Sequence, residues 1–245
     1  MKKWPIGTFV NMATVTIGSL IGMWLQQVFP PNIQNIIFQA IGLGVLVIGI
    51  LMSLKIPDGY LLIFIFSLIL GGILGELIHL KAGLEGIGDW IKTGFGITDS
   101  EFTKGLVTAF LLFCVGSMTI VGAIEEGLRG KRELLLVKST LDGISSIAFA
   151  ATYGIGVLFS ILPMLLFQGG ITVLARQMEH FFTKTIIDNL SAVGGVLILG
   201  IGINLLQLGT INIENLLPSL LIVVILTWGY ERVRKTEPSP TQLEK

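Results

Sequence analysis

The sequence predicts an all-α integral membrane protein with about eight transmembrane helices, and three observations support this prediction. Of its 245 residues, 52% are hydrophobic and only 13% are charged, whereas soluble domains carry about 25% charged residues. The mean hydropathy is +0.84, and several apolar runs of roughly 20 residues are long enough to cross ~30 Å of hydrocarbon as helices. Finally, one apolar phrase occurs twice in the chain, which indicates an internal repeat.

Proline and glycine set the ends of most predicted spans. Residues 1–235 form one transmembrane domain, and residues 236–245 form a polar, proline-bearing tail that we expect to be disordered on the cytoplasmic side. The predicted spans cover residues 6–28, 33–54, 60–80, 104–124, 139–159, 162–178, 187–208 and 216–230. Between the third and fourth spans, residues 82–100 carry apolar side chains at helix-like intervals. This segment is either an amphipathic helix in the outer interface or a plain loop.

The distribution of basic residues predicts the orientation. With the N-terminus inside, nearly all Lys and Arg residues fall on the cytoplasmic side, and the outer side receives only Lys81, Lys92 and Lys104. An even number of spans then places both termini in the cytoplasm.

The repeated phrase is "GLGVLVIGI" at residues 42–50 and "VGGVLILGI" at residues 193–201. A shift of 151 positions, from Gly44 to Gly195, aligns residues 6–80 with residues 162–231 and leaves residues 104–159 as a central helix pair. The shift spans five predicted helices, so the two copies run in opposite directions. Inverted repeats of this kind are common in secondary transporters. Alternatively, glycine-rich packing faces match by chance, or a duplication built a stable bundle without a transport role.

Asp142 is the most informative polar residue, because an acid at the centre of a bilayer costs roughly 2.5–3.5 kcal/mol. Ser145 and Ser146 lie three and four positions further on and therefore share its helix face. Together they offer oxygen ligands for a cation or a proton-accepting site. In the alternative interpretation, Asp142 pairs with Lys138 at a cytoplasmic helix N-terminus, where the helix dipole favours acids.

Two further segments carry candidate binding residues. Asn11 belongs to a polar stripe on the first span. Gln168, Gly169 and Gly170 form a candidate helix break in the sixth span, which would present backbone groups to a ligand. The alternative is a close helix crossing, with Gln168 as an interhelical hydrogen-bond donor. Glu125 and Glu126 are expected in a charged cytoplasmic loop, with a gating role as the second option.

The sequence argues against other classes of function. The formal net charge is zero, so nucleic-acid binding is not indicated. No motif of a hydrolase, metalloprotease or nucleotide-binding protein is present, and we expect no enzymatic activity, cofactor or metal.

Four phrases resemble a known family: "GTFVNMATVTIGSLIG" (residues 7–22), "CVGSMTIVGAIEEGL" (114–128), "KSTLDGISSIAFA" (138–150) and "AVGGVLILGIGINLL" (192–206). They are similar to the bacterial membrane proteins that share the domain of unknown function 554. The resemblance covers the chain up to its polar tail. It implies a multi-pass protein of the bacterial inner (plasma) membrane, described as a transporter candidate, and it brings no substrate or functional residues.

The sequence therefore favours a transporter or channel for a small solute or ion, linked to sodium or protons if Asp142 binds a cation. The competing hypothesis is a non-transporting scaffold or sensor that docks partners through a basic loop at residues 129–138. The expected surroundings are the lipid bilayer. Gly71, Gly72 and Gly75 could pack helices within one chain or within a homo-oligomer.

Overall fold

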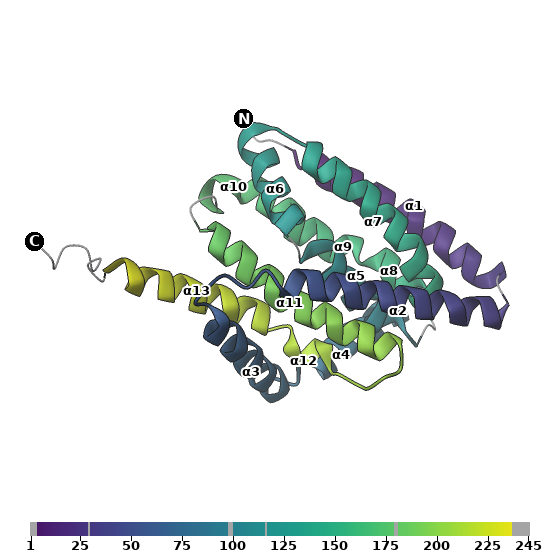
Figure 1. Cartoon of the computed structure of the whole chain (residues 1–245). Helices are drawn as coiled ribbons and strands as arrows, with labels where there is room; N and C mark the ends of the chain where they lie inside the picture. Colours follow the sequence, from purple (N-terminus) through teal and green to yellow (C-terminus); the bar gives the residue numbers. More distant parts are fainter. Residues whose placement is uncertain (1–3, 29, 98–99, 116, 179–180, 237–245) are drawn as a thin grey trace, which may run out of the picture.

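The computed structural model describes residues 4–28, 30–97, 100–115, 117–178 and 181–236, and the secondary structure in these ranges is helical (Figure 1). The expected tail at residues 236–245 lies almost wholly outside them. In chain order the elements are α1 (Ile6–Val28), α2 (Pro31–Ser53), α3 (Leu61–Leu77), α4 (Leu80–Phe95), α5 (Phe102–Cys114), α6 (Ser117–Arg129), α7 (Glu133–Tyr153), α8 (Ile155–Phe159), α9 (Ile161–Met164), the π-helix η1 (Leu165–Gly169), α10 (Gly170–Met178), α11 (Lys184–Leu205), α12 (Ile213–Leu216) and α13 (Ser219–Thr236).

Helices α1 and α7 form the most extensive helix pair and lie side by side in Figure 1. They run parallel, since Gly7 lies against Leu135 and Gly18 lies against Gly143. A Cβ atom at Gly18 would collide with the carbonyl oxygen of Gly143. Glycine therefore allows the two backbones to approach closely, as is common between helices in membranes.

The two copies of the repeated phrase pack against each other in α2 and α11. A Cβ atom at Gly49 would lie 2.8 Å from the carbonyl oxygen of Gly195, and one at Gly195 would lie 2.8 Å from that of Gly49. Because Gly42 lies against Leu206 near the other end of the contact, the two helices run antiparallel. Helix α3 also runs antiparallel to α12 and α13, since Gly71 lies against Ser219 of α13 and Gly75 against Asn215 of α12.

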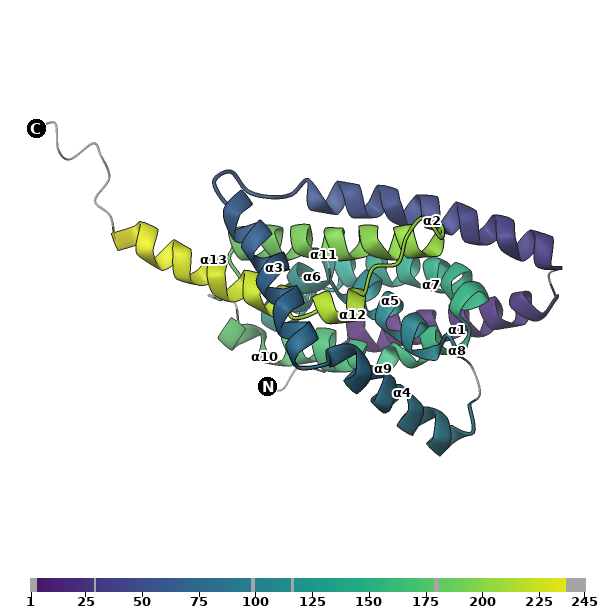
Figure 2. The same ribbon diagram turned by 90° about the horizontal axis from the view of Figure 1, so that it is seen from below.

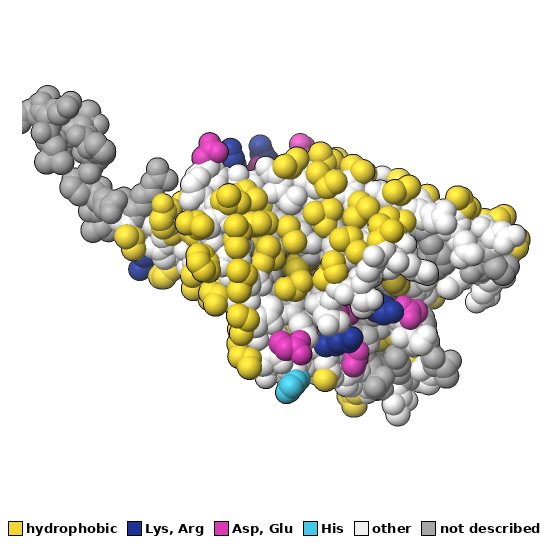
Figure 3. Space-filling model, turned by 60° about the horizontal axis from the view of Figure 1, so that its bottom comes forward, with side chains coloured by type: hydrophobic (Ala, Val, Ile, Leu, Met, Phe, Trp, Pro, Cys, Tyr) yellow, Lys and Arg dark blue, Asp and Glu magenta, His cyan; other side chains and the backbone are white. Residues whose placement is uncertain are grey.

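The molecular surface is that of a membrane protein. In Figure 3, hydrophobic side chains form a broad band over the face shown, and charged side chains gather on either side of that band. Exposed Leu, Ile and Phe side chains are especially frequent on α2 and α3, and soluble monomers rarely expose apolar patches of this extent.

Five helical segments of the described residues are long and apolar enough to cross a membrane, or up to seven if each of two bent pairs is one span. The predicted span that is missing from these seven is the second, residues 33–54, which corresponds to α2. The described apolar part of α2, Gln39–Ser53, is shorter than the others. The count of eight is therefore not confirmed. One bent pair is α5 with α6, which meet at 60° where the sequence predicted a single span over residues 104–124.

The segment after α3 folds as a helix rather than as a plain loop. Helix α4 is bent away from α3 by 57°. Figure 2 shows the change of direction between the two helices. His79 lies at this bend with a positive φ of 52°. Trp90 and Phe95 of α4 are exposed, as expected of an amphipathic helix at an interface, whereas the side chains of Ile87 and Ile91 lie outside the described residues.

Candidate functional site: a buried polar cluster and a vestibule

Four polar side chains from three elements meet inside the helix bundle. Lys138 and Asp142 of α7 form an ion pair. Asn11 of α1 donates from Nδ2 to Asp142 Oδ2 at 2.9 Å and to Gln168 Oε1 of η1 at 3.1 Å. We call these four residues the central polar cluster. Three of the residues predicted from the sequence, Asn11, Asp142 and Gln168, are thus brought together.

The cluster leaves hydrogen-bonding capacity unused. Among the described residues, Asn11 Oδ1 and Gln168 Nε2 find no hydrogen-bond partner, although both side chains are fully buried. Within the same part of the chain, the Thr8 hydroxyl, one turn before Asn11, is also buried without a partner. Buried polar groups are satisfied in the large majority of cases. The cluster therefore holds an acceptor and a donor that are ready for a further polar group.

The structure corrects the predicted position of Asp142 in its helix. The sequence placed the start of this span at residue 139, but α7 begins at Glu133 and ends at Tyr153, just before Gly154, whose φ is 63°. Asp142 is therefore near the middle of the candidate span Glu133–Tyr153, not one turn inside its N-terminus. The pairing with Lys138 that the alternative interpretation predicted is present, but both partners are buried.

The predicted helix break in the sixth span is a π-helical turn instead. The chain stays helical from Leu165 to Gly170, and Gln168 and Gly169 lie in η1. Single π-helical turns widen the helix and are frequent at functional sites. Gly169 lies against Thr8 and Pro5 of the first helical segment, whereas Gly170 faces open space. The Gln-Gly-Gly motif thus changes the helix locally from α to π where α1 packs against it, and the span continues without a break.

The two predicted serines lie beside the cluster. The Ser146 hydroxyl is buried against Gly18 and donates to the carbonyl of Gly143 in its own helix at 2.7 Å. Ser145 is half-buried and, among the described residues, makes no hydrogen bond with Asp142.

Glu126 is not in a charged loop, as the sequence suggested, but inside the bundle on α6 with 1% of its surface exposed. Its carboxylate accepts hydrogen bonds from the Gly7 backbone N–H at 2.9 and 3.2 Å and from Arg132 Nε at 2.8 Å. A carboxylate at a helix N-terminus is stabilised by the free amides there. Glu126 thereby ties α1, α6 and the segment before α7 together. Glu125 is half-buried and lines a small pocket with Arg129.

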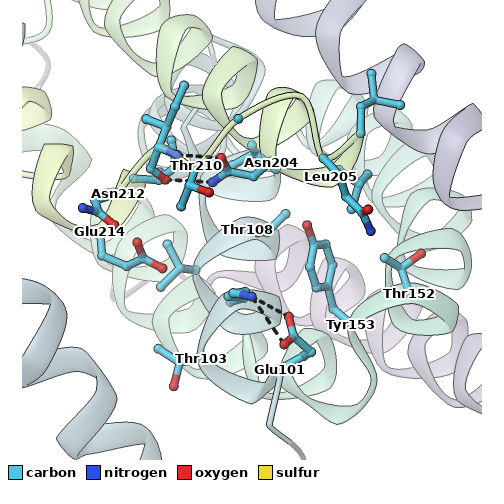
Figure 4. Close-up of a pocket in the computed structure, with 18 of the residues that line it drawn as sticks. Glu101, Thr103, Thr108, Thr152, Tyr153, Asn204, Leu205, Thr210, Asn212 and Glu214 are labelled. Carbon is cyan, nitrogen blue, oxygen red and sulfur yellow. Dashed lines mark hydrogen bonds and ion pairs between the residues drawn. The ribbon is translucent and has the colours of Figure 1, made fainter.

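The structure also contains a polar vestibule of about 1060 Å³ that the sequence did not reveal (Figure 4). Its walls come from α2, α4, α5 and the residues just before it, α7, α11, the α11–α12 connection and α12. The charged residues that line it are Lys81, Glu85, Glu101, Lys104 and Glu214. Asn204 bonds both backbone groups of Ile211 at 2.7 Å and so fixes the α11–α12 connection at the rim.

Aromatic side chains lie between the vestibule and the central polar cluster. The vestibule reaches Thr152 and Tyr153 on α7, and the ten-residue separation from Asp142 corresponds to about 15 Å along the helix axis. Phe149 lies within that interval. Its ring stacks with Tyr153 at 6.5 Å and meets the edge of Phe113 at 6.4 Å. On α7, Phe149 thus lies between the residues that line the vestibule and Asp142.

Sequence reasoning missed two parts of the site. Lys138 was considered only as a partner that neutralises Asp142. The vestibule gave no signal because its residues are scattered between positions 35 and 214 of the chain. Among the residues that the structure describes, no three His, Cys, Asp or Glu side chains are placed to hold a metal ion.

The apolar surface and the candidate spans define a multi-pass helical membrane protein with a charged cluster in its interior. Comparison with known families specifies it further: the chain belongs to the family described as "Protein of unknown function (DUF554)", whose model matches residues 6–228. It is 37% identical to the "Uncharacterized membrane protein YdfK" of Bacillus subtilis, with 88% of this chain and 93% of that protein covered. It is 30% identical to the "Uncharacterized protein YqgA" of Escherichia coli, with 91% and 96% covered. No solved structure matches it.

Proposed function

We propose that the protein is a transporter or channel that moves a small polar solute or ion across the bacterial inner membrane through the central polar cluster. The observation that carries this proposal is the Lys138–Asp142 pair in the middle of a candidate span, joined by amides from two other elements. Ionisable residues at this depth are costly, and in membrane proteins they mark substrate and ion pathways. The vestibule provides an aqueous approach from one end.

The packing supports an inverted repeat of eight spans, as in secondary transporters. Two of the three pairs of helices that the repeat relates, α2 with α11 and α3 with α13, pack against each other antiparallel. The third relates α1 to the span that contains η1, and these two meet at Asn11 and Gln168. A binding site where two repeats meet is the arrangement that this architecture predicts. The proposal also places both termini in the cytoplasm and Glu126 at an inner gate.

Cysteine accessibility tests this proposal without knowledge of the substrate. Cys114 is the only cysteine and is replaced by Ala, after which Ser145→Cys and Ile144→Cys are compared in membrane vesicles. Ser145 is on the Asp142 face, whereas Ile144 is 63% exposed on the apolar surface. A charged methanethiosulfonate should modify the thiol introduced at position 145 but not the one at position 144, because only a hydrated thiol ionises and reacts. Equal resistance of both positions would contradict a water-filled pathway.

A non-transporting scaffold is the second candidate, and one observation favours it: Lys138 and Asp142 neutralise each other in a closed core. The structure does not support the docking loop that this hypothesis used. Helix α6 ends at Arg129 and α7 begins at Glu133, so residues 130–132 alone connect them. Lys138 is buried, and Arg132 is paired with Glu126. Few of the basic side chains expected on a docking surface therefore remain available.

A further inference from the structure

Charges of both signs line the proposed pathway at both levels. In the vestibule, two ammonium groups, Lys81 and Lys104, line the same space as three carboxylates, Glu85, Glu101 and Glu214. In the central polar cluster, one ammonium group faces one carboxylate. Channels that select for cations or for anions line their pores with charges of one sign. The lining here favours a ligand that carries both signs.

The cluster also offers hydrogen-bonding groups in complementary pairs. On the acceptor side are the Asp142 carboxylate and the unpaired Asn11 Oδ1. On the donor side are the Lys138 ammonium group and the unpaired Gln168 Nε2. Both amide side chains are fully buried, so these atoms have no access to bulk water. Two acceptors and two donors match a ligand with one ammonium group and one carboxylate.

We propose that the ligand of the central polar cluster is a small zwitterion of the α-amino-acid type, an assignment that rests on the transport function proposed above. Its ammonium group binds Asp142 and Asn11 Oδ1, and its carboxylate binds Lys138 and Gln168 Nε2. Insertion replaces one buried ion pair by two, so every charge keeps a partner. A simple cation would leave Lys138 unpaired, and a simple anion would leave Asp142 unpaired, which is strongly unfavourable inside a protein.

Three probes of similar size separate these ligand classes. L-Alanine carries both charges, propionate lacks the ammonium group and ethylammonium lacks the carboxylate. The melting temperature of the purified full-length protein is measured with increasing concentrations of each, because a ligand that binds only the folded state raises it. We expect alanine to raise the melting temperature by ~2 °C or more at saturation, and we expect no shift with propionate or ethylammonium.

Two double variants assign the effect to the cluster. Lys138→Met with Asp142→Leu removes both charges together, so no charge is left unpaired and the protein keeps its fold, but the alanine shift should disappear. Lys131→Gln with Glu133→Gln removes two exposed charges of opposite sign that lie in neither the cluster nor the vestibule, and should keep the shift. A shift retained in the first variant, a shift produced equally by propionate or ethylammonium, or no shift with alanine in the wild type would each overturn the zwitterion assignment.

The two experiments together distinguish failure of the zwitterion assignment from failure of the transport proposal. If the Ser145→Cys variant is modified in vesicles but alanine produces no shift, a water-filled pathway exists and its ligand is of another class. If the Ser145→Cys variant is also resistant to the reagent, the transport proposal itself fails.

Discussion

Two ion pairs of the same chemistry lie in very different surroundings. Lys138 and Asp142 in the central polar cluster expose 7% and 10% of their side chains, whereas Lys104 and Glu101 in the vestibule expose 63% and 44%. Both pairs link positions one helical turn apart. Exposed pairs contribute little because water screens each charge, whereas a buried charge depends on its partner. The burial of an ion pair, rather than its mere presence, therefore identifies the site at which substitutions should affect function and stability most.

The largest effect is expected from breaking the buried pair. Asp142→Ala leaves the Lys138 ammonium group without a counter-charge in the core, which should cost ~3–5 kcal/mol of unfolding free energy. The Lys138→Met, Asp142→Leu double variant should recover most of that loss, since apolar replacements of a buried pair are often neutral. Unfolding in detergent measures both. If Asp142→Ala unfolds like the wild type, the pair is hydrated and the buried cluster is not as described.

A smaller loss is expected at the other buried carboxylate. Glu126→Ala removes the acceptor of the Gly7 N–H and of Arg132 and should cost ~2–3 kcal/mol, because the buried Gly7 N–H loses its hydrogen bonds. Glu125→Ala, one position earlier and only half-buried, is the matched control and should lie within ~0.5 kcal/mol of the wild type. If both substitutions lowered the unfolding free energy equally in the same measurement, the hydrogen bonds of Glu126 would not be important for stability.

The glycine contact that brings α1 against α7 should tolerate no side chain. In Gly18→Ala, the new methyl group would meet the Gly143 carbonyl, and forcing the helices apart should cost ~1–2 kcal/mol. Gly209 lines the vestibule, and a Cβ atom there would make an ordinary contact of 3.4 Å with Ile203. Gly209→Ala should therefore leave the melting temperature nearly unchanged. If Gly209→Ala lowered the melting temperature more than Gly18→Ala, the close contact between α1 and α7 would not be the sensitive position that we describe.

The smallest effect is expected at the exposed pair. Glu101→Gln should change the unfolding free energy by no more than ~1 kcal/mol, and added salt should reduce the difference further. Unfolding at low and high ionic strength measures it. A salt-independent loss as large as that of Asp142→Ala would show that the vestibule pair is structurally essential.

Much of the fold could be predicted from the sequence because apolar run length and proline and glycine positions are local signals. The first span, Ile6–Val28, was predicted with the bounds that the structure has. The sequence did not predict the bend between α5 and α6 or the start of α7 at Glu133, since both depend on packing between distant helices. The meeting of Asn11, Asp142 and Gln168 was anticipated only as three separate candidates. Their contact joins positions up to 157 residues apart in the chain, a separation at which a single sequence carries no pairing signal.

Transport through the central polar cluster is tested most directly by flux. Proteoliposomes of the wild type and of the Lys138→Met, Asp142→Leu variant are followed for uptake of labelled alanine, sodium and propionate. We expect the wild type to move alanine faster than protein-free liposomes do, and the variant to fall to the protein-free rate. Equal uptake of alanine by both proteins would contradict a role for the buried pair, and no uptake of alanine by the wild type would contradict transport of a zwitterion through the cluster.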